Sequence, residues 1–285
     1  MVERKEYLEQ LKAWKDEQVI KVVTGIRRCG KSTLLSQYQQ QLKTTGITNE
    51  QIVSVNFEKL EYEELLDYRK LYSYLKERLC AEKTTYIFLD EIQKVPSFEK
   101  VVDSLYVKPN VDIYITGSNA YMLSGDLATL LTGRYVEIKM LPLSFREFLC
   151  ITGMDAERGL AEYLRDGGLP YIAVMDRTAG KVETYLEGIY NTVIVKDIED
   201  RQARKESNPD KRKITDILLL KTIAKYLASV AGNPVSVRSI TNYLTSNGRK
   251  ISPNTVGDYV EALTESFIFY PAERFDIVGK QVLQT

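Results

Sequence analysis

The pattern of apolar and polar residues along this chain of 285 residues predicts alternating strands and helices in its first half. Residues 18–24 are an apolar run typical of a buried strand, and Leu34, Leu35, Tyr38 and Leu42 follow at helical spacing. Further apolar runs predict strands at residues 51–57, 85–89, 111–116 and 135–140. This alternation predicts an α/β fold built on a parallel sheet.

Helical spacing also indicates elements outside these strands. Apolar residues at Tyr7, Leu8, Leu11 and Trp14 predict a short amphipathic helix within residues 3–14. A charged helix is predicted from about Glu63 to Leu79, between the second and third strands.

The second half of the chain is predicted to be mostly helical. A long helix is expected over residues 181–201, followed by a charged linker over residues 201–213. Ser252 and Pro253 suit the cap and first turn of a helix. Two helices are expected before that point, at residues 214–230 and 237–244, and a strand is expected after it, at residues 267–270. Three helices followed by such a strand suggest a winged helix.

The turn after the first strand carries the clearest chemistry. Residues 25–32 match the phosphate-binding pattern G-x-x-x-x-G-K-[ST], in which backbone N–H groups cradle a phosphate. Lys31 is expected to reach the β- and γ-phosphates, and Ser32 to ligate Mg²⁺ through its hydroxyl. A helix that begins at this loop also favours an anion there. The candidate ATP-binding residues in the loop are Gly25, Arg27, Arg28, Cys29, Gly30, Lys31, Ser32 and Thr33.

Two acidic residues follow the third strand directly. Asp90 and Glu91 would lie at the carboxyl edge of the sheet, next to the phosphate loop if the first and third strands are neighbours. We expect Asp90 to hold Mg²⁺ with Ser32, and Glu91 to accept a proton from the attacking water. A helix cap or a solvated turn is the alternative for an isolated acid pair; the upstream loop favours the catalytic interpretation.

Two further candidates lie beyond the fourth strand. Asn119, or its neighbour Ser118, could hydrogen-bond the γ-phosphate or the water, although a plain turn is the alternative. Arg134 could stabilise transition-state charge on the γ-phosphate of a neighbouring subunit, which would require a homo-oligomer. A solvated surface arginine is the alternative for Arg134.

The composition of the chain excludes several classes of chemistry and of partner. Thirty-nine basic residues balance thirty-nine acidic residues, so bulk charge favours neither nucleic acid nor an anionic membrane as a partner. The chain has no histidine, which excludes Ser-His-Asp chemistry and histidine-ligated metals. No apolar run approaches the length of a membrane span, and the N-terminus lacks the apolar core of a signal peptide. We expect a cytoplasmic protein without membrane association.

The three cysteines, at positions 29, 80 and 150, are too far apart in sequence to suggest a zinc site. Cys29 stands beside a helix N-terminus and two arginines, where a thiolate would be stabilised and reactive. An inert loop residue is the alternative.

Together, the loop at 25–32, the strand end at 87–91, the strand tip at 116–119 and the turn at Gly133 and Arg134 resemble the AAA+ ATPases. The resemblance is to the prokaryotic branch akin to origin-recognition and STAND-type ATPases, and it covers about residues 18–200. It implies ATP and Mg²⁺ as ligands, ATP hydrolysis as the activity, and a helical lid in which Pro170 packs near the adenine. Relatives in that branch often continue into a nuclease-like domain, an activity that we do not carry over to a chain that ends at Thr285.

We therefore predict a P-loop ATPase core at residues 1–150, a helical lid and linker at 151–212, and a winged-helix domain at 213–285. Hydrolysis is expected to move the lid and the winged helix. The alternatives are a nucleotide-gated switch and a DNA-binding regulator in which hydrolysis is incidental. The third helix of the winged-helix region carries Asp258 and Glu261 and no cation, which disfavours DNA contact and favours a protein partner.

Overall fold

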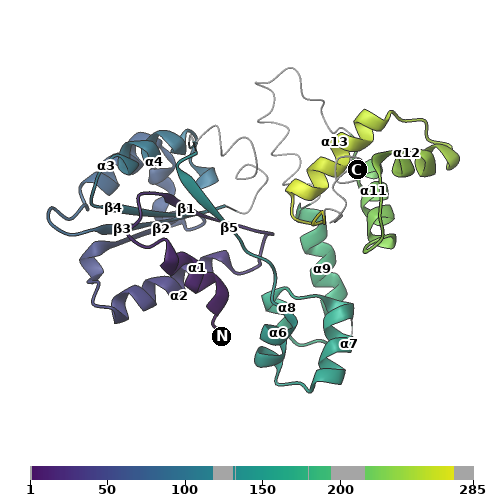
Figure 1. Cartoon of the computed structure of the whole chain (residues 1–285), viewed down its shortest axis with the longest axis horizontal. Helices are drawn as coiled ribbons and strands as arrows, with labels where there is room; N and C mark the ends of the chain where they lie inside the picture. Colours follow the sequence, from purple (N-terminus) through teal and green to yellow (C-terminus); the bar gives the residue numbers. More distant parts are fainter. Residues whose placement is uncertain (1, 118–130, 132, 179, 194–215, 273–285) are drawn as a thin grey trace, which may run out of the picture. The chain divides into compact units, whose positions relative to one another are not determined.

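A computed structural model gives the structure of the chain, and it describes residues 2–117, 131, 133–178, 180–193 and 216–272 (Figure 1). The chain divides into two compact units, Met1–Tyr185 and Leu186–Thr285. Among the helices that the structure describes, none has both the length and the apolar character needed to cross a bilayer.

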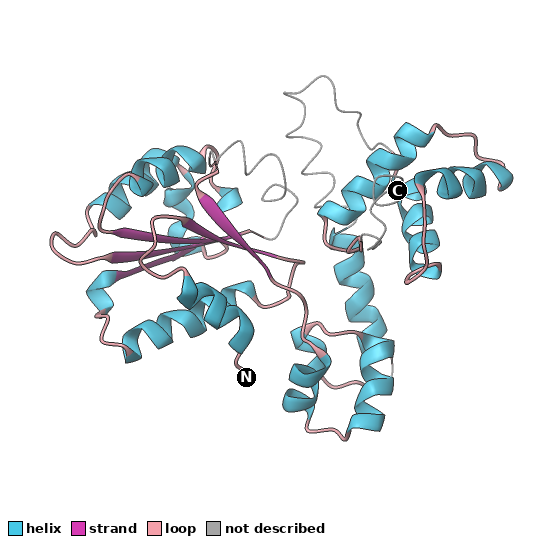
Figure 2. Cartoon of the chain, in the orientation of Figure 1, coloured by secondary structure: helices cyan, strands magenta, loops and turns pink. Residues whose placement is uncertain are grey.

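The first unit is built around a parallel sheet with helices on both faces (Figure 2), which confirms the predicted α/β class. Its strands are β1 (Ile20–Thr24), β2 (Ile52–Asn56), β3 (Thr85–Asp90), β4 (Val111–Thr116) and β5 (Tyr135–Lys139). Their order across the sheet is β2-β3-β4-β1-β5, and every pairing is parallel. Since all five strands run the same way, their carboxyl ends meet at one edge.

One condition attached to the predicted site is not met. The acid pair was expected beside the phosphate loop if the first and third strands are neighbours, but β4 lies between β1 and β3. Strand order is set by contacts between segments far apart in the chain, which the pattern within each strand does not contain. The loop after β1 must therefore cross the end of β4 to approach the acids after β3.

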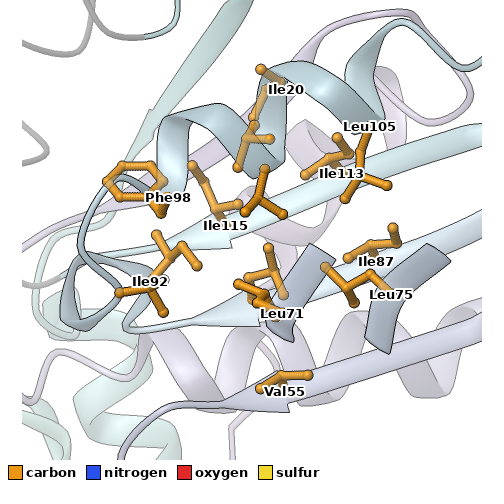
Figure 3. Close-up of a cluster of buried hydrophobic side chains, with 14 of the residues drawn as sticks. Ile20, Val55, Leu71, Leu75, Ile87, Ile92, Phe98, Leu105, Ile113 and Ile115 are labelled. Carbon is orange, nitrogen blue, oxygen red and sulfur yellow. The ribbon is translucent and has the colours of Figure 1, made fainter. Parts of the chain in front are cut away.

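Side chains alternate between the two faces of the sheet, so each face has its own core. On one face, α3 (Tyr68–Lys76) and α4 (Phe98–Tyr106) cover residues such as Val55, Ile87 and Ile115 (Figure 3). On the other face, α1 (Lys5–Ala13) and α2 (Lys31–Thr44) cover alternate residues of the same strands, among them Phe88 and Tyr114. Strands with both faces covered explain the nearly continuous apolar runs in the sequence.

The charged helix predicted from Glu63 to Leu79 is shorter than expected. Residues Leu60–Leu66 form a 3₁₀ helix, η2, and α3 begins only at Tyr68. The Asp67 carboxylate accepts hydrogen bonds from the backbone N–H groups of Arg69 (2.8 Å) and Lys70 (3.0 Å). This side chain caps α3, so the helix starts at the cap rather than at the first charged residue. Two other short 3₁₀ helices flank strands of the sheet, η1 (Asn49–Gln51) and η3 (Ile92–Lys94).

Beyond β5 the first unit continues into helices. They are α6 (Phe145–Thr152), α7 (Ala156–Asp166), α8 (Pro170–Val174) and the start of α9 (Lys181–Asn191), whose later residues belong to the second unit. The backbone N–H of Leu143 donates to the carbonyl of Gly168 (2.6 Å), and Tyr163 donates to the carbonyl of Leu143 (2.7 Å). These bonds fix the start of α8 against the segment that leaves β5.

The second unit packs the predicted three helices, α11 (Ile217–Ser229), α12 (Val237–Ser246) and α13 (Pro253–Glu265), around one core. Ser252 caps α13 as predicted, with its Oγ accepting from Thr255 N–H (3.1 Å). The strand expected from Phe267 is wrong, because the described residues 266–272 contain none. Phe267 instead takes a left-handed conformation (φ 59°) and its N–H donates to the carbonyl of Thr264, which closes the end of α13.

Candidate functional site

The loop between β1 and α2 has the backbone shape that the phosphate-binding pattern requires. Gly25 has φ 146°, and a Cβ added there would lie 2.2 Å from the carbonyl oxygen of Met140. Gly30 has φ 103° and is the N-cap residue of α2. Only glycine fits both positions without strain or a clash. The backbone therefore curls at the N-terminus of a helix of fourteen residues, where an anion is favoured.

Lys31 is the first residue of α2 and is only 4% exposed. Its ammonium donates to the carbonyls of Gly25 (3.0 Å) and Ile26 (3.2 Å), and so lies over the loop. A phosphate in the loop would offer this cation stronger acceptors than the two neutral carbonyls.

The other loop residues differ in exposure. Ser32 and Arg28 are exposed, while Arg27 and Thr33 are partly buried. The Arg28 guanidinium lies 5.6 Å from the centre of the Tyr185 ring, which belongs to α9. The loop thus has one cation that already contacts the helical region beyond β5.

Asp90 ends β3 and is bound by the ends of two neighbouring strands. Its Oδ2 accepts from Asn56 Nδ2 of β2 (2.7 Å), and its Oδ1 accepts from the hydroxyl of Thr116 of β4. Thr116 Oγ1 also accepts from the backbone N–H of Glu91 (3.0 Å). Three parallel strands therefore hold the acid pair at their common carboxyl edge.

The pKa of Asp90 is raised above its ordinary value, mainly because the carboxyl is buried. Hydrogen bonds from Thr116 and Ser32 oppose the rise, whereas the nearby Glu91 carboxylate adds to it. The effect of Ser32 matters most for the site, because Ser32 belongs to the first turn of α2 and Asp90 to the end of β3. The two predicted motifs thus lie close together even though β4 separates their strands.

Glu91 follows Asp90 in a left-handed conformation (φ 57°) and is buried. A non-glycine residue in this region costs free energy, and such conformations cluster at functional sites. Gln93 Nε2 lies 2.5 Å from Glu91 Oε2. The acid expected to act as a base is therefore held by a neighbouring amide.

The remaining candidates are distributed differently. Asn119 and Ser118 lie outside the described residues. Pro170 starts α8 and lies beside the loop, since a Cβ added to Gly30 would be 3.8 Å from Pro170 Cγ. Cys29 is fully buried and burial raises the pKa of its thiol, which favours the inert alternative over the reactive one.

Arg134 lies at the other edge of the sheet. It precedes β5, and its carbonyl accepts from the N–H of Ile20, the first residue of β1. Its guanidinium is half-exposed, 3.9 Å from Asp103 Oδ1 and 5.2 Å from the centre of the Tyr106 ring. Because the phosphate loop follows the opposite ends of these strands, Arg134 is remote from the loop of its own chain.

Sequence reasoning missed Asn56, Gln93 and Arg4. Asn56 had a signal, since it is the polar residue that ends a strand at the edge already expected to carry the site. Buried Arg4 had none, because its partners are distant in sequence. It pairs with Glu147 of α6 (2.8 Å) and donates to the carbonyls of Leu141 (2.9 Å) and Cys29 (3.4 Å).

The residues present fit a magnesium nucleotide. The two glycines let the loop curl at the N-terminus of α2, and Lys31 supplies a buried cation. The Ser32 hydroxyl and the Asp90 carboxylate are oxygen donors of the kind that Mg²⁺ prefers, and Mg²⁺ is usually bound by one or two carboxylates together with substrate phosphates. The site therefore suits a triphosphate better than an all-protein metal cage.

Comparisons with known proteins agree with this site. Residues 17–149 match the model of an AAA domain, and residues 157–284 match a domain of unknown function (DUF8612). An uncharacterized protein of Haemophilus influenzae is 40% identical over 291 residues, covering 100% of this chain and 70% of that protein. An uncharacterized protein of Methanocaldococcus jannaschii is 28% identical over 283 residues, covering 92% of this chain and 58% of the relative.

Among solved structures, a Walker-type ATPase of Pyrococcus abyssi has a TM-score of 0.49 at 17% identity, over 93% of this chain and 90% of that chain. The AAA match covers the whole sheet with its phosphate loop and acid pair, and the Haemophilus influenzae protein matches the chain from end to end. This chain therefore belongs to the family of AAA-domain proteins that includes the Haemophilus influenzae protein.

Proposed function

We propose that this chain binds ATP with Mg²⁺ and hydrolyses it. The observation that carries the proposal is that Ser32 lies close enough to the Asp90 carboxyl to lower its pKa, because this brings the phosphate loop and the acid pair into one site. Neither motif alone would distinguish a nucleotide site from a glycine turn or a capped strand end.

Each residue then has a defined task. The loop N–H groups and Lys31 hold the β- and γ-phosphates, and Ser32 and Asp90 hold the metal, which neutralises phosphate charge when bound. Glu91 orients the attacking water and accepts its proton. Burial of Lys31, Asp90 and Glu91 strengthens these interactions because the local dielectric is low.

The decisive experiment is Glu91→Gln with ATP binding and turnover measured separately. We expect turnover to fall at least about 100-fold, since a general base contributes that much, while ATP affinity is retained. Glu77→Gln is the matched control, because Glu77 is an exposed residue at the end of α3. Normal turnover by the Glu91 variant would refute the proposed role.

We further propose that hydrolysis moves the helices beyond β5 and the second unit. Contacts of Pro170 with Gly30 and of Arg28 with Tyr185 support this, since they join the loop to α8 and α9. A nucleotide-gated switch is the competing function. Single-turnover and steady-state rates, measured with and without DNA, would separate the two and would also detect a DNA-binding regulator.

Arg134 is proposed to act on the ATP of a neighbouring copy, because its own loop lies at the opposite edge of the sheet. Arg134→Ala and Glu91→Gln chains should each be inactive alone and partly active when mixed, since a mixed assembly restores complete sites. No recovery on mixing would argue against a shared site.

A further inference from the structure

Gln93 contacts Glu91 because of the local chain path. Glu91 turns the chain through its left-handed conformation, and η3 then folds back over residues Ile92–Lys94. This brings Gln93 Nε2 to 2.5 Å from Glu91 Oε2, with Gln93 itself only 8% exposed.

The turn that carries Gln93 is firmly anchored. Ile92 and Val95 are fully buried in the core under α3 and α4. The N–H of Lys94 donates to the Glu91 carbonyl (3.1 Å), and that of Val95 to the Ile92 carbonyl (2.9 Å). A side chain on so fixed a frame can define the direction of its partner.

The oxygen of the Gln93 amide shows that packing alone does not explain a glutamine at this position. Gln93 Oε1 is buried and has no hydrogen-bond partner among the residues that the structure describes. The amide cannot be reversed, because the Glu91 carboxylate accepts hydrogen bonds and so requires the N–H₂ side. An apolar side chain of similar size would avoid the cost of burying that oxygen. The amide is therefore retained for what its N–H does to Glu91.

We propose that Gln93 is a positioning residue for catalysis: its amide holds the Glu91 carboxylate in the orientation that proton transfer needs. The inference rests on the proposed function, in which Glu91 is the base. A general base must lie within hydrogen-bond reach of the proton that it accepts, so a buried donor that fixes its direction supports the chemical step.

A merely structural role for Gln93 makes a different prediction. It would lower thermal stability and ATP affinity together with turnover, because the whole site would be disturbed. A positioning role instead lowers kcat and leaves ATP affinity unchanged, because the interaction matters only in the chemical step. The split between kcat and ATP affinity therefore distinguishes the two roles.

The test compares Gln93→Met, which keeps the length and removes the donor, with Gln93→Ala and with Gln39→Met as control. Gln39 Nε2 donates to Ser54 Oγ at the surface (3.2 Å), far from the acid pair in sequence, so its loss should be neutral. Both Gln93 variants should bind ATP with unchanged affinity, and kcat at neutral pH should fall about 10-fold, as for other residues that orient a catalytic group.

Glu91→Gln, measured in parallel, separates this inference from the proposed function. If Glu91→Gln is inactive and both Gln93 variants keep the wild-type kcat, the Gln93 inference alone is overturned. Full turnover by Glu91→Gln would remove the base itself, and both would then be rejected. Folding of each variant is checked by its thermal unfolding and its ATP affinity, and Gln93→Ala provides the answer if Gln93→Met does not fold.

Discussion

The sheet buries charged groups at both of its edges, but the two clusters differ in how they are paired. At the amino edge, Lys21 of β1 and Asp112 of β4 are 0% and 2% exposed and form an ion pair of 2.5 Å. Lys21 also donates to the Glu17 carbonyl (2.8 Å), while Asp112 Oδ2 accepts from Tyr114 (2.8 Å) and from the N–H of Asp16 (2.9 Å). Each charge at this edge is matched by partners within the protein.

The carboxyl edge is less completely matched. Lys31 donates to two neutral carbonyls, and Gln93 Oε1 lacks a hydrogen-bond partner within the described residues. Burial raises the pKa of the aspartate at both edges, so the difference lies in the partners and not in the pKa. The comparison teaches that a closed polar cluster stabilises the fold, whereas an incomplete one on the same sheet is suited to a ligand.

The largest effect is expected from a substitution that breaks the closed cluster of Lys21 and Asp112. Asp112→Ala leaves the Lys21 ammonium buried without its carboxylate, and removing one partner of a buried ion pair costs about 3–5 kcal/mol. We expect the free energy of unfolding, measured in urea, to fall by that amount. The double variant Lys21→Met with Asp112→Leu should recover much of the loss, because neither charge remains. A single variant that unfolds like the wild type would show that the cluster does not stabilise the sheet.

Arg4 tests whether pairing or location determines the effect, since it contacts the phosphate loop yet is paired with a carboxylate. Arg4→Met removes the ion pair with Glu147 and the bonds to the carbonyls of Cys29 and Leu141. We expect a loss of about 2 kcal/mol in urea unfolding, because buried carbonyls lose their donor. Arg69→Met, which removes an exposed arginine beside Tyr68, should change stability by less than about 0.5 kcal/mol.

Asp90→Asn should affect ligand binding far more than folding. Burial raises the pKa of Asp90 above 3.8, so the native protein binds more protons than the unfolded chain just above that pH. The free energy of unfolding contributed by this group therefore falls as pH rises through that window, the reverse of an ordinary salt-bridged carboxylate. We expect Asp90→Asn to change stability by less than about 1 kcal/mol at neutral pH, since the charged form is already disfavoured.

The same pKa predicts the pH dependence of metal binding. Mg²⁺ requires the ionised carboxylate, so the metal-dependent part of ATP affinity should weaken on acidification at a higher pH than an ordinary aspartate would allow. Calorimetry with and without Mg²⁺ across the acidic range measures this. Asp90→Asn should abolish the metal dependence, and an unchanged metal dependence in that variant would exclude Asp90 as a ligand.

The smallest effect is a difference in thiol reactivity. Cys150 is exposed, whereas Cys29 is buried with a raised pKa, so an alkylating reagent should label Cys150 first and Cys29 only after unfolding. Mass spectrometry of partly labelled protein identifies the modified residue. Rapid labelling of native Cys29 that ATP suppresses would instead favour the reactive alternative.

Sequence alone could predict the parts of the site that are local. The glycine loop, the strand before it and the helix after it are contiguous, and Asp90 and Glu91 directly follow their strand, so short-range patterns suffice. Strand order depends on which distant segments pair, which is why β4 was not expected between β1 and β3. Gln93 and Arg4 were missed for a similar reason, since their roles arise from a backbone turn and from tertiary contacts. The predicted start of the helix at Glu63 was wrong because the Asp67 side chain caps the helix four residues later, and helical spacing does not reveal this cap.

The surroundings of Gly30 have a mechanical consequence. A Cβ at this position would lie 3.5 Å from Met140 Cε and 3.8 Å from Pro170 Cγ, so the residue leaving the last strand and the residue starting α8 both border the same turn. Close-packed interiors transmit displacements rather than absorb them. A displacement of this turn would therefore reach both neighbours directly, and no intermediate relay is needed between the anion and α8.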